Sequence, residues 1–316
     1  MRTRRSGVVP HIVARTKRGT TPLAGGELVR TIAVVGATGL QGRAVTERLL
    51  ADGWAVRALT RTPSRATGPA PFVGAEMDDV DSLVAAMTGA HGVFSVQPTV
   101  GSPGAPPGFT ADDEVRWGRN VAEAARRAGV AHLVYSSVAG AGRDEELPVN
   151  VAAKARVERA LDLPATVLRP VSFMENFTGA YALRDGAVAT GLAPHVPQQL
   201  IAVDDVAALV ALAFSAPGTW IGRAVDVAGD EPTPVEVAAA ISAAVGRELP
   251  YEQVPVEAIR AVGEDFAFAN EWLNERGYRA DVAATRRLLP GAEDLRAWLA
   301  RVGAARIDAF LSGSAR

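Results

Sequence analysis

The chain contains no cysteine, so disulfide bonds, thiol nucleophiles and cysteine-ligated metal centres are excluded. Histidine is scarce as well: the chain has only His11, His91, His132 and His195, and no pair has the spacing of a zinc site. No uninterrupted apolar run reaches the roughly 20 residues that a membrane-spanning helix needs. A formal net charge of −2 gives no general attraction to nucleic acid or anionic lipid. We therefore expect a cytoplasmic protein with small-molecule partners and no metal, membrane or nucleic-acid partner.

The first 28 residues are rich in arginine, contain no acid before Glu27 and show no apolar period. This composition predicts a disordered basic arm over residues 1–28. The apolar stretch 8–13 is interrupted by Pro10 and His11, and it is too short for the roughly 7–15 apolar residues of a signal peptide. The arginines leave open an electrostatic tail for nucleic acid or lipid, but an arm without a role is favoured.

Residues 31–42 run from β-branched apolar side chains into three closely spaced glycines and then into a helical pattern. The pattern predicts a strand, a tight turn and a helix start. Gly36 allows the turn, Gly39 lets the backbone approach a pyrophosphate, and Gly42 lets the helix pack on the strand. Free N–H groups at the helix start would face the phosphates. An ordinary strand-to-helix turn without a ligand is the alternative, and the strand before and the amphipathic helix after the glycines argue against it.

A second strand is predicted over residues 54–61, and its exposed end carries Arg61 instead of an acid. An acid there would bind the ribose 2′-hydroxyl of NAD, whereas a cation suits the 2′-phosphate of NADP. Arg61 and Arg65, separated by a turn at Pro63, can bind that phosphate from two sides. Two solvated arginines without a ligand are the alternative. The expected cofactor is NADP(H).

The remainder of the first half alternates between strand and helix patterns, which predicts a parallel sheet covered on both faces. Helices are expected at residues 83–87, 112–128 and 150–158, and strands at 92–98, 131–138 and 165–170. Asp79 or Asp81 is expected to cap the first of these helices. The loop at residues 99–110, rich in proline and glycine, is interpreted as a mobile loop beside the site or as a linker.

From residue 171 onward the pattern loosens into helices separated by turns, expected at residues 206–214, 234–244 and 295–302, with a short strand at 224–227. We predict an α/β fold in which a Rossmann-type, doubly wound parallel sheet spans residues 29–170. Residues 171–316 are expected to form a smaller C-terminal portion on the substrate side.

Several segments together resemble the NmrA-like family of atypical short-chain dehydrogenase/reductases. The matching segments are residues 35–42, 60–63, 133–137, 168–176 and 228–231, and the resemblance continues through 271–273 and 277–281 to Trp298. The glutamine that follows the Gly-Ala-Thr-Gly core and the Phe-Met-Glu-Asn segment are specific to this group. The resemblance implies an NAD(P)-binding Rossmann core with a smaller portion over the cleft.

The resemblance also implies roles for individual residues. The pyrophosphate would be held by Gly36, Ala37, Thr38, Gly39, Leu40, Gln41 and Gly42, and the 2′-phosphate by Arg61 with Arg65. Glu76 and Met77 would flank the adenine, although the family more often has an aspartate at the position of Glu76. The nicotinamide side would be lined by Ser95, Val96, Gln97, Val171, Ser172, Phe173 and Met174.

The chain departs from hydride-transferring short-chain dehydrogenases, which use a tyrosine four residues before a lysine as an acid/base pair. The lysine is present as Lys154, but Asn150 stands at the tyrosine position. We expect Lys154 to hold the nicotinamide ribose; direct acid/base work and a solvated helix lysine are the alternatives. The strand at 131–138 ends in Ser136 and Ser137, where a doubly wound enzyme would place a catalytic serine.

Two functions remain open. The first is an NADPH-dependent reductase of a small electrophile such as a quinone or an enone, in which the cofactor performs the difficult step. The second is a non-catalytic NADP(H)-sensing regulator that acts through a protein partner, as some members of the family do. The missing tyrosine favours the regulator. The complete nicotinamide-side segments favour the reductase, which we prefer.

Overall fold

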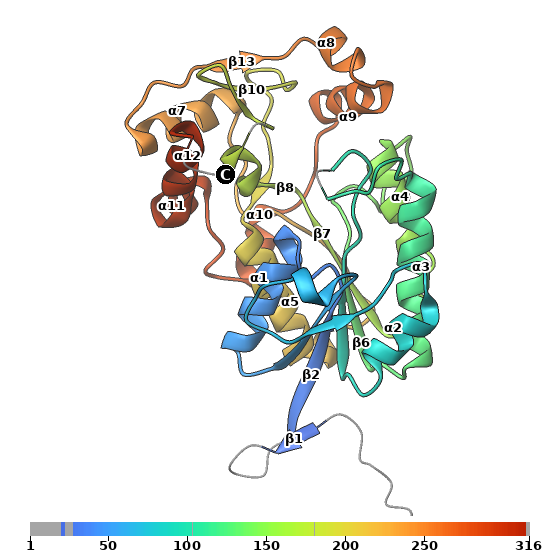
Figure 1. The fold of residues 1–316 in the computed structure, drawn as a ribbon. Helices are drawn as coiled ribbons and strands as arrows, with labels where there is room; N and C mark the ends of the chain where they lie inside the picture. The colour runs from blue at the N-terminus through green and yellow to red at the C-terminus, as the bar shows by residue number, and fades with distance from the viewer. Residues whose placement is uncertain (1–19, 23–27, 103, 180, 314–316) are drawn as a thin grey trace, which may run out of the picture.

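The computed structural model describes residues 20–22, 28–102, 104–179 and 181–313. A parallel sheet with the strand order β12-β7-β6-β5-β2-β3-β4 forms its centre (Figure 1). Because β2 lies between β5 and β3, the chain leaves it in both directions, which confirms the predicted doubly wound α/β fold. The strands are β2 (Leu28–Val34), β3 (Ala55–Thr60), β4 (Phe72–Gly74), β5 (Gly92–Ser95), β6 (His132–Ser136), β7 (Ala165–Pro170) and β12 (Ala224–Val227).

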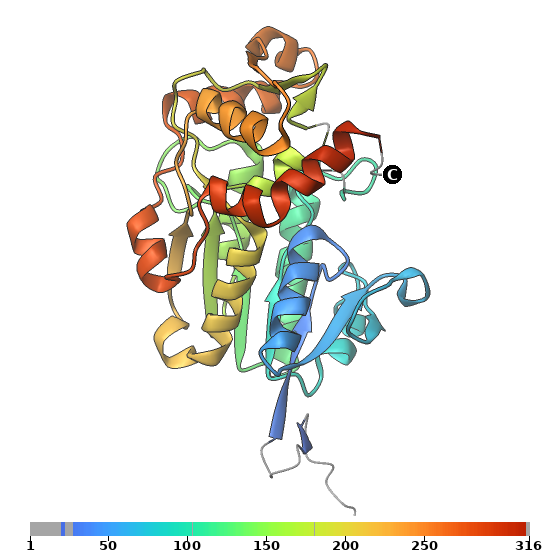
Figure 2. The ribbon, with the colours of Figure 1, turned by 90° about the vertical axis from the view of Figure 1, so that its left-hand side faces the viewer.

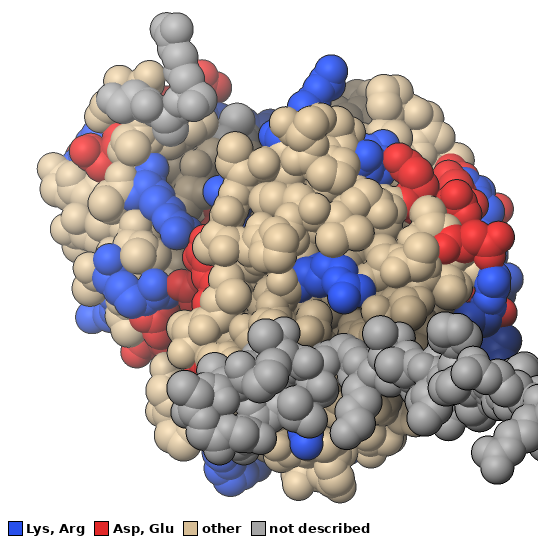
Figure 3. All heavy atoms as spheres, turned by 60° about the horizontal axis from the view of Figure 1, so that its bottom comes forward, with Lys and Arg blue, Asp and Glu red and all other residues tan. Residues whose placement is uncertain are grey.

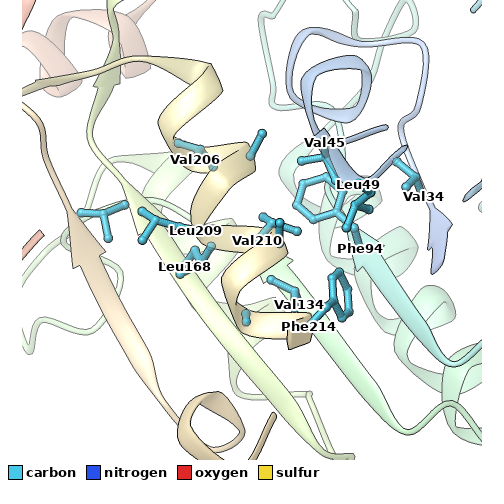
Figure 4. Packing of buried hydrophobic residues seen from close by; sticks show 14 of the residues in the cluster. Val34, Val45, Leu49, Phe94, Val134, Leu168, Val206, Leu209, Val210 and Phe214 are labelled. Atoms are coloured by element: carbon cyan, nitrogen blue, oxygen red, sulfur yellow. The ribbon is translucent and has the colours of Figure 1, made fainter. Parts of the chain in front are cut away.

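Helices cover both faces of this sheet (Figures 1 and 2). On one face, α1 (Leu40–Ala51) and α5 (Val203–Ser215) pack on the strands; Figure 4 shows Leu49 of α1 and Phe214 of α5 in the same buried cluster as Phe94 of β5. The other face is covered by α2 (Val80–Met87), α3 (Ala111–Arg127) and α4 (Val149–Glu158). Strands buried on both sides need apolar residues at consecutive positions, which is why the pattern of β2 is continuous instead of alternating.

The second half of the chain also contributes to this core. Strand β12 pairs in parallel with β7, so the short strand expected at 224–227 is confirmed. Helix α5 fills the sheet face beside α1, and its side chains share one buried cluster with α1. The predicted boundary at residue 170 therefore does not separate two layers in space, because an open parallel sheet must be covered on both faces.

A smaller portion lies beyond the carboxyl ends of the strands, at the top of Figure 1. Its own buried cluster surrounds Trp298, Ile241 and Ile307. The final helical segment, expected at 295–302, continues through a π-helical turn to Leu311. The strands are β8 (Ser172–Phe173), β9 (Leu183–Arg184), β10 (Ala187–Thr190), β11 (Leu200–Ile201) and β13 (Tyr251–Gln253). The helices of this portion are α7 (Pro234–Val245), α8 (Val256–Arg260), α9 (Glu264–Glu275), α11 (Leu295–Trp298) and α12 (Ala304–Leu311). Two further short helices, α6 (Pro217–Trp220) and α10 (Val282–Leu288), pack on the buried cluster of the sheet core.

The expectation of a disordered arm over residues 1–28 is wrong for four of its residues, which lie in β1 and at the start of β2. Strand β1 (Thr20–Pro22) pairs antiparallel with the start of β2. The first residues of β2 extend beyond its neighbours β3 and β5, whose pairing begins at Thr31 and Ile32, so their backbone groups would otherwise lack ladder partners. Residues 1–19 and 23–27 lie outside the described residues.

Charged side chains are mixed on the face drawn in Figure 3, where basic groups stand singly or beside acidic ones. Opposite charges placed together cancel the long-range attraction that a polyanion would feel. Among the described helices, none combines the length and the apolar character needed to cross a membrane.

Candidate functional site

The glycine turn after β2 has the tight geometry that its sequence predicts. Gly36 has φ +71°, a conformation that glycine adopts without strain. A Cβ on Gly42 would lie 2.6 Å from the carbonyl carbon of Gly36 and 2.8 Å from Cα of Ala37. Only glycine at position 42 therefore allows α1 to start so close to the strand that it follows. A Cβ on Gly39, by contrast, would meet nothing closer than the Gly36 oxygen at 3.4 Å.

The amino end of α1 is left open toward solvent. Gly39 is the N-cap and supplies no side-chain cap, and the first turn contains no acid. Thr38, Gly39 and Leu40 are exposed, whereas Ala37 is buried. Uncapped N–H groups at the positive end of a helix favour an anion. The side chain of Gln41 is turned away, because its Oε1 accepts a hydrogen bond of 2.6 Å from Ser136 Oγ.

Two arginines stand at the end of β3, next along the sheet from the glycine turn. Arg61 follows the strand directly, and Arg65 lies in the short 3-10 helix Pro63–Arg65. Both side chains are exposed, and neither forms an ion pair with another residue of the described ranges. Two unpaired guanidinium groups fit a phosphate ligand, for which planar donors are suited.

Glu76 and Met77 follow β4 at the edge of the sheet, and their backbone is fixed by side chains. The N–H of Glu76 donates to Ser82 Oγ at 3.0 Å, and the carbonyl of Met77 accepts from Asn120 Nδ2 at 2.8 Å. Glu76 is exposed and Met77 half-buried. Their role beside an adenine stays a prediction.

The residues after β5 lie next to the glycine turn. Gln97 is buried and its Nε2 donates to Ser95 Oγ at 2.9 Å, while its Oε1 has no partner among the described residues. Val96 is so close that a Cβ on Gly36 would lie 2.9 Å from its Cγ1. This strand end therefore offers a rigid, largely apolar wall with one unsatisfied hydrogen-bond acceptor.

Lys154 is not a solvated helix lysine. Its Nζ donates to Glu114 Oε1 at 2.7 Å, and the two side chains are 9% and 0% exposed. Burial raises the pKa of Glu114, and the ammonium of Lys154 opposes that rise. An ammonium has three donors, so this ion pair leaves others for a ribose. That ribose contact stays a prediction, while the ion pair with Glu114 was not foreseen.

The two serines at the end of β6 are both engaged. Ser136 Oγ donates to Gln41, and Ser137 Oγ donates to Glu158, which also pairs with Arg169 at 2.5 Å. Neither hydroxyl is therefore the free catalytic serine that this strand end would offer. Their hydrogen bonds instead connect β6 to the start of α1, beside the glycine turn, and to α4.

The segment after β7 is held by the smaller portion. Val171 and Met174 are buried, Ser172 and Phe173 are half-buried, and β8 pairs in parallel with β11. The ring of Tyr278 contacts that of Trp272 edge to face, at a centroid distance of 5.8 Å. Burial raises the pKa of Tyr278 to about 12, so this phenol remains protonated at neutral pH.

A cavity of about 330 Å³ lies in the smaller portion, a volume at the lower end of the range of ligand pockets. Its lining includes Gly101, Tyr181, Val254, Ile259, Val262 and Phe266. Sequence reasoning missed this cavity and Tyr278. The segments around Trp272 and Tyr278 carried part of the family resemblance, but no spacing in them indicates a chemical role.

Comparisons with known proteins agree with this arrangement. The NmrA-like family profile matches residues 29–299. The chain is 34% identical over 289 residues, which are 85% of this chain and 96% of the relative, to a (4-alkanoyl-5-oxo-2,5-dihydrofuran-3-yl)methyl phosphate reductase of Streptomyces griseus subsp. griseus. It is 30% identical over 251 residues, 72% of this chain and 68% of the relative, to the nitrogen metabolite repression protein nmrA of Emericella nidulans. The triphenylmethane reductase of Citrobacter sp., solved with NADP(H), has the same fold, with a TM-score of 0.72 at 20% identity over 88% of this chain and 99% of that chain.

Proposed function

The chain belongs to the NmrA-like family, and on this premise we propose that it is an NADP(H)-dependent oxidoreductase of a small electrophile such as a quinone or an enone. Two relatives support the reductase class: the Streptomyces protein is named a reductase, and the Citrobacter reductase was solved with NADP(H). When bound, the dinucleotide supplies the hydride, and the protein supplies position and electrostatics.

One observation carries the proposal: the uncapped, exposed amino end of α1 stands beside two arginines that lack ion-pair partners within the described residues. The residues present fit a dinucleotide phosphate. Gly39 and its neighbours offer backbone donors to a pyrophosphate, and Arg61 with Arg65 offers charged donors to a 2′-phosphate. Lys154 would bind the nicotinamide ribose, and the 171–174 segment would lie on the nicotinamide side.

The preference for NADP(H) is tested by the double substitution Arg61→Ala with Arg65→Ala. A charge-assisted hydrogen bond contributes about 1.5–3 kcal/mol, so we expect NADPH affinity to fall about ten- to a hundredfold and NADH affinity to stay unchanged. Calorimetric titration measures both. Arg126→Ala with Arg127→Ala removes the same charge from the last turn of α3 and should leave both affinities intact. Equal binding of NADPH and NADH by the unmodified protein would contradict the preference.

A non-catalytic NADP(H) sensor is the second candidate, favoured by Asn150 at the position of the usual tyrosine and by the similarity to the repression protein nmrA. The two functions separate in one experiment, in which NADPH absorbance is followed against quinones, enones and aldehydes. Turnover on any of them supports the oxidoreductase. A large difference between NADPH and NADP⁺ affinity without turnover on the panel supports the sensor.

Lys154 requires a paired design, because Lys154→Ala alone would leave the Glu114 carboxylate buried without its partner. We therefore use a double variant that carries both Lys154→Met and Glu114→Leu. It is compared with the single variant Lys154→Arg. If Lys154 binds the ribose, the double variant folds stably but loses NADPH affinity, and Lys154→Arg recovers part of it. Normal NADPH binding by the double variant would show that Lys154 does not contact the cofactor.

A further inference from the structure

Half of the large hydrophobic side chains that stand exposed among the described residues gather around one cavity. Val262 and Phe266 are 77% and 41% exposed, and both line the cavity of about 330 Å³ in the smaller portion. Apolar surface kept in contact with water costs free energy, and its concentration at one concave place is typical of a ligand site. The volume lies within the range of about 300–1,000 Å³ for small-molecule pockets.

The walls of this cavity are fixed by close packing between β10 and the helices α8 and α9. Gly191, directly after β10, has no room for a Cβ, which would overlap Ile259 and the amide of Asn270. Asn274 of α9 holds the same segment: its Nδ2 donates to the carbonyl of Gly191 at 2.9 Å, and its Oδ1 accepts from the N–H of Ala193 at 2.6 Å. The cavity is therefore preformed, so a ligand would not have to order its walls.

The loop after β5 joins this cavity to the predicted cofactor side. Gly101, four residues beyond Gln97, lines the cavity and packs so closely on Phe266 that a Cβ would lie 2.5 Å from the ring. Figure 1 shows this loop beneath α9, on the side where the strands end. Ligands of doubly wound folds bind beyond the carboxyl ends of the strands. A ligand in the cavity would therefore lie on the same side of the sheet as the proposed dinucleotide site.

Among the described residues that line the cavity, Arg184 is the only one with a charged side chain, and we call the space the Arg184 cavity. Arg184 ends the short strand β9 and is exposed, so its guanidinium can meet both solvent and a ligand. Planar guanidinium donors pair with a carboxylate through two parallel hydrogen bonds. One cation balances one negative charge, so a carboxylate fits better than a phosphate monoester, which carries nearly two.

A neighbouring cavity of about 460 Å³ has the opposite charge. It shares only Gly191 with the Arg184 cavity, and no basic side chain is among the described residues of its lining. Its lining includes three acids, Glu257, Glu271 and Glu275. Because like charges repel, an acidic ligand is disfavoured there and favoured in the Arg184 cavity.

We propose that the Arg184 cavity binds a small amphipathic acid, with its apolar chain against Val262 and Phe266 and its carboxylate on Arg184. As a statement about substrate, this inference rests on the proposed oxidoreductase function: the electrophile that is reduced carries an apolar chain and a carboxylate, and its reactive group lies toward Gly101. The apolar wall supplies most of the affinity, and the arginine selects the charged headgroup and sets the direction of the chain.

The headgroup is tested by calorimetric titration of decanoate into the full-length protein saturated with NADP⁺. Decanol has the same chain without the charge, and butyrate has the same charge with almost no chain, so decanoate should bind more tightly than either. Arg184→Gln should weaken decanoate binding about three- to tenfold, between the effects of an exposed ion pair and a charge-assisted hydrogen bond, and leave decanol binding unchanged. Arg184→Lys should recover part of the loss. Arg247→Gln, at an exposed arginine outside both cavities, is the matched control and should bind decanoate normally.

The apolar wall is tested with two further substitutions. Phe266→Ala should weaken decanoate and decanol binding equally, by about tenfold, because both ligands lose the same apolar contact. Ile221→Ala truncates an apolar side chain that is 39% exposed outside the cavity, and it should change neither affinity. Val262→Asp should weaken decanoate binding more than decanol binding, whereas Val262→Lys should not. The exposure of Val262 makes the melting temperature insensitive to either change.

Two results would overturn the inference. The first is no binding of decanoate by the unmodified complex, and the second is an affinity for decanoate that Arg184→Gln leaves unchanged or that Arg247→Gln lowers equally. If decanoate binds as expected but no quinone, enone or aldehyde oxidises NADPH, the binding site stands and the oxidoreductase proposal fails. Turnover of one of these electrophiles without decanoate binding would give the reverse outcome.

Discussion

The sheet core and the smaller portion above it are held together by different kinds of contact. In the core, consecutive apolar residues of β2 such as Ile32, Ala33 and Val34 are fully buried between two helical layers. Burial of apolar surface contributes about 25 cal/mol per Å², and it requires no particular partner. Such a core tolerates change at single contacts but depends on dense packing.

The smaller portion has an apolar cluster of its own, and buried polar side chains add hydrogen bonds between groups far apart in sequence. Glu175 accepts from the N–H of Val203 at 3.1 Å and from the indole of Trp298 at 3.2 Å. Gln199 donates to the carbonyl of Ala280 and accepts from its N–H, at 2.8 and 2.9 Å. Each of these contacts has a defined geometry, and losing one partner leaves the other buried without a hydrogen bond. The comparison predicts that substitutions of Glu175 and Gln199 act through lost hydrogen bonds, whereas substitutions at the glycine turn act through steric clashes.

The largest effect is expected from Glu175→Ala. Two buried donors lose their acceptor and a cavity forms, which should cost about 3–5 kcal/mol of unfolding free energy. Urea unfolding measures the loss, and hydrogen exchange should place it in residues 171–316. Glu175→Gln keeps one acceptor oxygen and should lose about half as much. A cost below about 1 kcal/mol for Glu175→Ala would show that the smaller portion is not held by this contact.

In the core, the sharpest steric test is Gly42→Ala against Gly39→Ala. The methyl group at position 42 would clash with the rigid backbone of Gly36 and Ala37. We therefore expect the unfolding free energy to fall by about 2–3 kcal/mol and the distorted turn to bind the dinucleotide less tightly. At position 39 the methyl fits, so stability should change by less than about 1 kcal/mol while affinity for the phosphates falls. Thermal unfolding and NADPH titration separate the two outcomes. Equal stability of both variants would refute the role of Gly42 in packing.

The elements that the sequence predicts correctly are those encoded by consecutive residues. The β2 strand, the glycine turn and the helix after it are encoded within a dozen consecutive residues, so local pattern was sufficient. Strand β12 was found because its short apolar run is bounded by turns. Of the two caps expected for α2, Asp79 and Asp81, the structure has Asp79, which accepts from the N–H groups of Asp81 and Ser82.

Contacts between residues far apart in sequence were not predictable. Lys154 meets Glu114 across 40 residues, and nothing around either residue marks the pair. Gln199 and Ala280 are separated by 81 positions and are joined by two hydrogen bonds that no local pattern indicates. Helix α9 was not expected either; its buried residues are Ala267 and Trp272, while Phe266 and Asn270 line the cavity.

A moderate, pH-dependent effect is expected at Asp205. Burial raises its pKa to about 6, although the N–H of Glu293 donates to it at 2.8 Å. The pKa of Asp205 is higher in the folded than in the unfolded protein, so the protonated carboxyl favours the folded state. Its contribution to the unfolding free energy is full below about pH 4 and is lost as the pH rises to about 6. Asp205→Asn should flatten that slope and add up to about 2 kcal/mol at neutral pH. Unfolding at several pH values measures the slope, and an unchanged slope in Asp205→Asn would contradict the assignment to Asp205.

The smallest effect comes from one substitution made in both regions. The hydroxyl of Tyr135 is buried in the core without a hydrogen-bond partner among the described residues, and that of Tyr251 bonds to Thr190 and to the carbonyl of Leu192. Tyr135→Phe removes an unpaired polar group and should raise the unfolding free energy by about 0.5–1 kcal/mol. Tyr251→Phe removes a used one and should lower it by about 1 kcal/mol. Urea unfolding resolves the signs, and a loss at Tyr135 equal to that at Tyr251 would mean that polar contacts stabilise the core as they do the smaller portion.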